Sequence, residues 1–95
     1  MIYRWVRNSD GKVALIGETD RRLTERANNY LSAKPDSQAG ATNKKVYREQ
    51  QKLAKIDDFL YLEFTDNVAG YDLNDQRERR LAEKLLVGYS KPYLQ

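Results

Sequence analysis

Two short runs of alternating residue type lie on either side of the sequence Asn8-Ser9-Asp10-Gly11, and this arrangement constrains the fold more than any other part of the chain. Asp-Gly between two such runs is a strong hairpin signal, because glycine accepts the positive φ that a tight turn requires. We therefore expect an antiparallel pair of strands at residues 2–6 and 12–16.

A third strand is predicted at residues 59–64, where leucine and phenylalanine alternate with aromatic and acidic residues over a short length. Its length and composition suit a strand that pairs with the hairpin. The three strands together predict a small antiparallel sheet.

Three helices are predicted from apolar residues that recur every three or four positions. The capping candidates, in chain order, are Thr19 or Asp20, Thr42 or Asn43, and Asn74 or Asp75. The first helix is expected to run to about residue 33. The last is expected to pack through a stripe made of Leu81, Ala82, Leu85, Leu86 and Tyr89. Glu83 lies beside this stripe.

The order of these elements predicts the fold class. It is α+β, a small three-stranded antiparallel sheet flanked by helices in the order ββααβα. A chain of 95 residues is expected to form one domain over residues 1–95. A domain of this size buries only about two-thirds of its unfolded surface, so a catalytic site must lie near the surface.

The chain contains no cysteine and no histidine, and this limits the chemistry that it can perform. Disulfides, thiolate nucleophiles, imidazole bases and a zinc cluster are all excluded. Reactive groups must come from tyrosine, arginine, lysine, aspartate or glutamate. No apolar run approaches the roughly 18 residues of a membrane span, and the first residues lack a signal-peptide pattern. We therefore expect a cytoplasmic protein with no membrane partner.

Charge is unevenly distributed along the chain, although the net charge is only +3. Cations outnumber acids between residues 21 and 52, whereas residues 57–75 contain six acids and no cation. One side of the fold is therefore expected to face phosphate, with the acids on another side.

Several widely separated motifs share their order with a known family. Ile2-Tyr3 lies near the start and Leu15-Ile16-Gly17 ends the second predicted strand. Arg26 follows on the first predicted helix, and Glu83 precedes Lys91-Pro92 at the end of the chain. In this order the motifs resemble the GIY-YIG nuclease domain, and the resemblance covers essentially the whole chain.

The resemblance implies a metal-dependent endonuclease that hydrolyses DNA phosphodiester bonds. Glu83 would bind Mg²⁺ or Mn²⁺, which prefer oxygen ligands. Arg26 would stabilise the scissile phosphate, because a planar guanidinium makes paired hydrogen bonds to it. Tyr3 would assist the attacking water, and Tyr30 is a fourth site candidate. The expected DNA contacts are Arg22, Lys44, Lys45 and Arg48, which would add affinity through counterion release. An attached targeting domain or partner protein is also implied.

Each of these residues also has an interpretation without catalysis. Tyr3 suits packing on a sheet face, and Tyr30 suits packing on an apolar helix face. Arg26 suits a solvated helix surface. Glu83 is spaced to pair with Arg79 or Arg80 on its own helix. The lysines of the second helix suit a solubilising surface.

Leu15 stands where the family has its second motif tyrosine, and leucine cannot transfer a proton. Three groups can then activate water: Tyr3, Tyr30 or a metal-bound hydroxide. The alternative function is a catalytically inactive domain of the same fold that binds nucleic acid or protein. Two smaller departures are Met1 in place of the first glycine and Gln95 in place of the usual asparagine.

Overall fold

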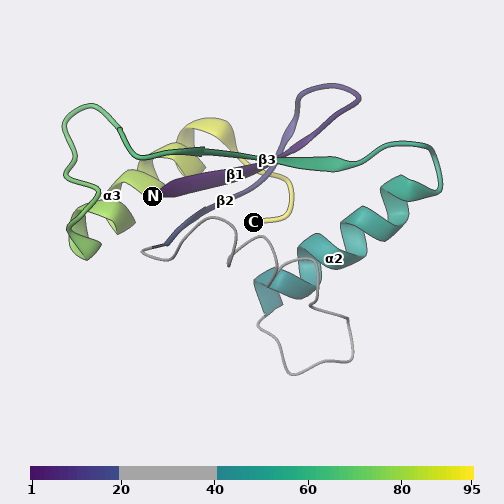
Figure 1. Cartoon of the computed structure of the whole chain (residues 1–95), viewed down its shortest axis with the longest axis horizontal. Coiled ribbons are helices and arrows are strands. Elements are labelled where there is room, and N and C mark those ends of the chain that lie inside the picture. Colours follow the sequence, from purple (N-terminus) through teal and green to yellow (C-terminus); the bar gives the residue numbers. More distant parts are fainter. Residues whose placement is uncertain (20–40) are drawn as a thin grey trace.

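A computed structural model describes residues 1–19 and 41–95 of the chain (Figure 1). The described elements, in order, are β1 (Ile2–Arg7), β2 (Val13–Glu18), α2 (Ala41–Ala54), β3 (Leu60–Thr65) and α3 (Gln76–Ser90). The helix predicted to run to about residue 33 lies outside the described residues. The described elements therefore follow the order ββαβα.

The three strands form one antiparallel sheet in the order β2-β1-β3, which confirms the predicted α+β class and sheet. The hairpin turn is also confirmed, because Gly11 has φ 71° and donates its backbone N–H to the Arg7 carbonyl at 2.9 Å. In this register Tyr3 of the central strand lies between Gly17 of β2 and Phe64 of β3.

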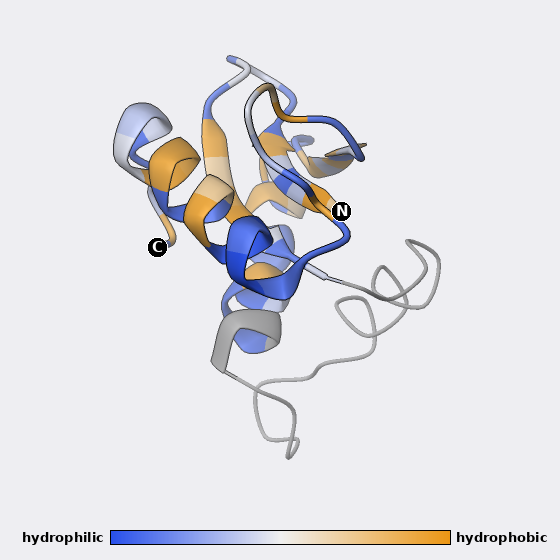
Figure 2. Cartoon of the chain, turned by 90° about the vertical axis from the view of Figure 1, so that its left-hand side faces the viewer, coloured by the Kyte–Doolittle hydropathy of each residue, from blue (hydrophilic) through white to orange (hydrophobic). Residues whose placement is uncertain are grey.

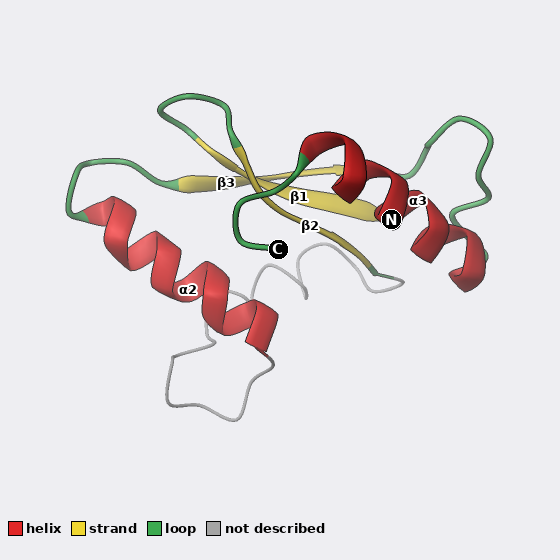
Figure 3. Ribbon diagram, turned by 180° about the vertical axis from the view of Figure 1, so that it is seen from behind, coloured by secondary structure: helices red, strands yellow, loops and turns green. Residues whose placement is uncertain are grey.

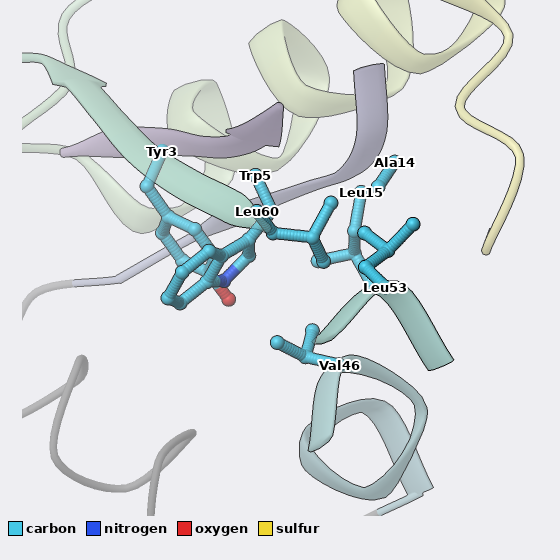
Figure 4. Close-up of a cluster of buried hydrophobic side chains, with 7 residues drawn as sticks. All are labelled: Tyr3, Trp5, Ala14, Leu15, Val46, Leu53 and Leu60. Carbon is cyan, nitrogen blue, oxygen red and sulfur yellow. The ribbon is translucent and has the colours of Figure 1, made fainter. Parts of the chain in front are cut away.

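The two described helices cover opposite faces of the sheet. Side chains alternate between faces along a strand, so Tyr3 and Trp5 point to one face and Ile2 to the other. The first face packs against α2 through Val46 and Leu53, and the second packs against Ala82 of α3. Figure 4 shows the side chains of the first cluster. Figure 3 shows α2 and α3 toward opposite ends of the sheet.

Both edges of the sheet are partly covered by a glutamine side chain. The Gln95 amide donates to the Ile16 carbonyl at 2.6 Å and accepts from the Ile16 N–H at 2.8 Å, on the outer edge of β2. The Gln50 amide makes the same pair of bonds to Leu60 on the outer edge of β3, at 3.0 and 2.8 Å. The unpaired backbone groups of an edge strand can pair with another chain. Each glutamine amide satisfies the backbone N–H and C=O of one edge residue.

The predicted cap of helix α2 is wrong. Thr42 and Asn43 both lie within the helix, which is described from Ala41 to Ala54, so neither residue can be its N-cap.

Helix α3 begins as predicted, with Asp75 as its N-cap. The Asp75 carboxylate accepts from the Arg77 N–H at 2.8 Å. The predicted apolar stripe is partly wrong. Ala82 is buried and Leu86 half-buried, but the exposed part of the stripe comprises Leu81 (50%), Leu85 (55%) and Tyr89 (87%). The apolar face of the helix is broad, and periodicity alone did not show which side of it packs on the sheet.

Gln50→Ala tests the contribution of an edge amide. The substitution leaves the part-buried N–H and C=O of Leu60 without their partners, so the free energy of unfolding is expected to fall by about 1–3 kcal/mol. Urea unfolding followed by the fluorescence of the single tryptophan, Trp5, measures this loss. The matched control is Gln51→Ala, whose exposed side chain bonds only to the Tyr47 hydroxyl. Equal losses in the two variants would contradict the assignment.

Candidate active site at the end of strand β2

A pocket of about 240 Å³ lies where β1, β2, α2, α3 and the C-terminal segment meet. Its lining residues are Tyr3, Leu15, Ile16, Gly17, Glu18, Lys45, Glu83, Leu94 and Gln95. Two of the expected catalytic residues, Tyr3 and Glu83, therefore lie around one hollow with Lys45, an expected DNA contact, and with the whole of Leu15-Ile16-Gly17. These residues come from positions up to 80 apart in the sequence.

Tyr3 is held against the backbone of Gly17, its partner in the sheet register. The tyrosine is 2% exposed. A Cβ built on Gly17 would overlap Oη and Cζ of the Tyr3 ring. Position 17 therefore requires glycine because the ring occupies the space of a side chain, and not because of a positive φ. This contact fixes the Tyr3 hydroxyl at the pocket.

The half-buried Glu83 has no ion pair or hydrogen bond to its carboxylate within residues 1–19 and 41–95. Burial is the main cause that raises its pKa above the usual value, and the negative charge of Glu18 adds to the rise. Arg80 and Lys84 oppose it. Glu83 is therefore a carboxylate whose charge is not neutralised by a direct contact in this part of the chain.

The arginines that were spaced to pair with Glu83 pair with Glu18 instead. Nε of Arg79 lies 3.0 Å from one Glu18 oxygen, and Nε of the exposed Arg80 lies 3.8 Å from the other. Arg79 is only 6% exposed, and its Nη1 also donates to the Leu73 carbonyl at 3.1 Å. Arg79 thus holds Glu18 in place at the pocket.

Glu18 is a second carboxylate of the pocket, and the sequence reasoning missed it. The sequence feature that could have indicated Glu18 is its position directly after Leu15-Ile16-Gly17, at the end of β2. Its side chain lines the same pocket as these three residues. The long-range pairing with Arg79 could not be inferred from local spacing.

The pocket offers chemistry that suits a divalent cation with hard oxygen ligands. The described residues contain no group of three or more acidic ligands, so no cage made only of protein side chains is present in this part of the chain. Mg²⁺ commonly binds through one or two carboxylates and completes its coordination with water and substrate phosphate. Glu83 fits this pattern, because its carboxylate carries no cationic partner there and lies near a second negative charge.

Leu15 and Gln95, the two departures from the family pattern at the pocket, have clear structural roles. Leu15 is 2% exposed and belongs to the cluster with Tyr3, Trp5 and Val46, so it closes the apolar wall of the pocket. Gln95 also lines the pocket, and its amide holds the edge of β2 at Ile16. The C-terminal segment runs back beside β2 in Figure 1.

The remaining predicted site residues are not brought into this pocket by the described part of the chain. Arg22, Arg26 and Tyr30 lie outside the described residues. Lys44 is half-buried on α2 and is not a lining residue. Arg48 is exposed and lines a separate hollow along α2 with Lys52 and Lys55.

Comparison with known proteins gives no family assignment. The chain matches no protein-family model, no curated protein and no solved structure. No helix in residues 1–19 and 41–95 is long and apolar enough to cross a membrane. What the pocket does must therefore be argued from its own geometry.

Gly17→Ala tests the contact that positions Tyr3. The new methyl group would displace the ring, and overpacking of this kind costs about 1–3 kcal/mol of the free energy of unfolding. Gly88→Ala is the matched control, because nothing lies within 4 Å of a Cβ built at this site in α3. There the substitution is expected to stabilise the fold by about 0.5–1 kcal/mol. A neutral Gly17→Ala in urea unfolding would show that the ring is not held as described.

Glu83→Gln tests the electrostatic state of the pocket through stability. The folded-state pKa is raised, so stability declines as pH rises from the unfolded-state value through the folded-state value and is constant above both. The glutamine variant avoids this decline, so its melting temperature should exceed that of the wild type at about pH 7. The advantage should vanish at about pH 3, where the carboxyl is protonated in both states.

Glu78→Gln is the control for this measurement, because Glu78 lies in the first turn of the same helix but does not line the pocket. An acid there is favourable to the helix dipole, so the control should gain no stability at neutral pH. A melting temperature of Glu83→Gln below that of the wild type at neutral pH would mean that Glu83 has a stabilising partner.

Proposed function

We propose that this protein is a metal-dependent endonuclease that hydrolyses DNA phosphodiester bonds. The observation that carries the proposal is the gathering of Tyr3, Gly17, Lys45 and Glu83 around one pocket, from four separate elements. The resemblance to the GIY-YIG nuclease domain implicates Tyr3, Gly17 and Glu83, and Lys45 is an expected DNA contact because of its charge. An α+β fold with a three-stranded antiparallel sheet is compatible with that domain.

Glu83 is the proposed ligand of the divalent cation, with Glu18 as a second negative charge at the pocket. Glu18 is neutralised by Arg79, whereas Glu83 has no such partner among the described residues, which leaves Glu83 the better ligand. A bound Mg²⁺ or Mn²⁺ would supply charge stabilisation to the phosphate and its leaving oxygen.

Tyr3 and Lys45 supply further polar groups at the pocket. Tyr3 has the only side-chain hydroxyl among the described lining residues, and its position against Gly17 is fixed. In the proposed reaction this hydroxyl orients the attacking water by a hydrogen bond. Lys45 is exposed at the start of α2 and presents an ammonium group, which binds phosphate as a point charge. Arg26 keeps its proposed role in stabilising the phosphate.

Leu15 makes the wall beside Tyr3 apolar, which has a consequence for catalysis. A leucine neither donates nor accepts a proton, so the second motif provides shape but no acid or base. Proton transfer is therefore assigned to groups outside this motif, with Tyr3 the described candidate.

Nicking of supercoiled plasmid with Mg²⁺ or Mn²⁺ tests the proposal. The wild type should nick the plasmid, EDTA should stop the reaction, and Glu83→Gln should lower the rate by about two orders of magnitude or more. Glu78→Gln, on the same helix but outside the pocket, should retain nearly full activity. Because Glu83→Gln is expected to be at least as stable as the wild type at neutral pH, unfolding would not explain its loss.

Failure of this experiment has a definite meaning. Near-wild-type nicking by Glu83→Gln would contradict the assigned metal ligand. Absence of nicking by the folded wild type, with salt-sensitive DNA binding intact, would favour the alternative of an inactive binding domain. This alternative is supported by the buried Leu15, which stands where the family has a tyrosine and cannot transfer a proton.

A further inference from the structure

The outer surface of α3 carries three exposed cations that the pocket itself does not use. Arg77, Arg80 and Lys84, together with Gln76 and Leu81, line a hollow of about 250 Å³. None of these residues was among the expected DNA contacts. The first turns of α3 are strongly hydrophilic in Figure 2.

Helical geometry places Arg80 nearest to the candidate metal ligand Glu83, with Lys84 and Arg77 farther around the helix. At 3.6 residues per turn, Arg80, Lys84 and Arg77 lie about 60°, 100° and 120° around the helix axis from Glu83. The exposed Leu81 and Leu85 come next, at about 160° and 200°. The cations therefore form a strip between the pocket and the exposed apolar stripe, and Arg80 reaches the pocket residue Glu18 at 3.8 Å.

Helix α2 carries a second row of cations that begins at the same pocket. Lys45 lines the pocket, Arg48 and Lys52 follow it on α2 at spacings of three and four residues, and Lys55 comes directly after the end of the helix. Residues at these spacings share one helix face, so the row extends away from the pocket along α2 for about 10 Å or more. The two rows flank the pocket from helices on opposite faces of the sheet.

Acidic side chains are concentrated in one stretch of the sequence. Residues 57–75, which include β3 and the loop before α3, contain six acids and no cation. The sheet order places β3 at the edge opposite to β2, the strand whose end forms the pocket. A polyanion is therefore attracted to the two cationic rows rather than to residues 57–75.

We propose that the DNA strand leaving the pocket passes over α3, where Arg77, Arg80 and Lys84 bind the phosphates that flank the scissile bond. The rows on α2 and α3 then form one phosphate-binding track that crosses the site. The proposal rests on the nuclease function for the position of the scissile bond, but DNA binding by the track does not require cleavage. The strip of Arg77, Arg80 and Lys84 is positively charged and adjoins the pocket through Arg80. Both features favour DNA over a protein as its partner.

Salt-dependent binding of a labelled DNA duplex, of about 20 base pairs and in EDTA, tests the track. Each lost phosphate contact lowers the slope of log K against log salt by about 0.9. Arg77→Gln/Lys84→Gln should therefore make the slope shallower by about 1.8. Neither residue lines the pocket or makes an ion pair within the described part of the chain.

The matched control is Lys12→Gln/Lys91→Gln, which removes the same net charge from two exposed residues that line neither the pocket nor the hollow on α3. Its slope should stay close to that of the wild type. Equal changes in both double variants would overturn the track, because overall charge would then explain the binding. An unchanged slope in Arg77→Gln/Lys84→Gln would overturn it as well, and would leave the α3 surface to a protein partner.

The two proposals can fail separately. A shallower slope for Arg77→Gln/Lys84→Gln in a protein that cuts no DNA would support the track and contradict the nuclease. Cleavage that depends on Glu83, with unchanged slopes in both double variants, would support the nuclease and contradict the track.

Discussion

The contact between the Tyr3 ring and the backbone of Gly17 is the constraint on which the site depends. It follows from the register of β1 and β2, which places the two residues opposite each other. The ring takes the space of the missing side chain, so the strand pairing and the position of the hydroxyl are set together. Gln95 adds a second constraint one residue earlier, because its amide holds the outer edge of β2 at Ile16. The wall of the pocket is therefore held in place by the end of a strand. A strand positions catalytic side chains more precisely than a loop does.

The two carboxylates at the pocket lower the stability of the fold, and packing gives no reason for them to be there. Two carboxylates, Glu18 and Glu83, lie near each other at a partly buried place, and only Glu18 has cationic partners among the described residues. An unpaired half-buried charge lowers stability, and such perturbed groups cluster at functional sites. The buried Arg79 limits the cost by pairing with Glu18. This division leaves one carboxylate held by the fold and one available to a ligand.

The local features of the fold were predictable because their causes are local. Asp10-Gly11 specifies the hairpin, and the side chain of Asp75 starts α3. The exposed Leu81, Leu85 and Tyr89 were misassigned because the apolar face of α3 is broad, and only the sheet decides which side of it is buried. The Glu18–Arg79 pair and the edge amides of Gln50 and Gln95 join residues distant in sequence or depend on tertiary geometry. Tyr3 and Glu83 were expected at one site through a resemblance rather than through any local pattern.

The central claim is that Glu83 binds a divalent cation at the end of β2. The most direct test is titration of the ¹⁵N-labelled protein with Mn²⁺, because the paramagnetic ion broadens the amide signals nearest to it. The account predicts saturable broadening first at Gly17, Glu18 and Glu83, with the effect lost in Glu83→Gln. Broadening centred instead on the acidic residues Asp66, Asp72 and Asp75, or none that depends on Glu83, would contradict the account.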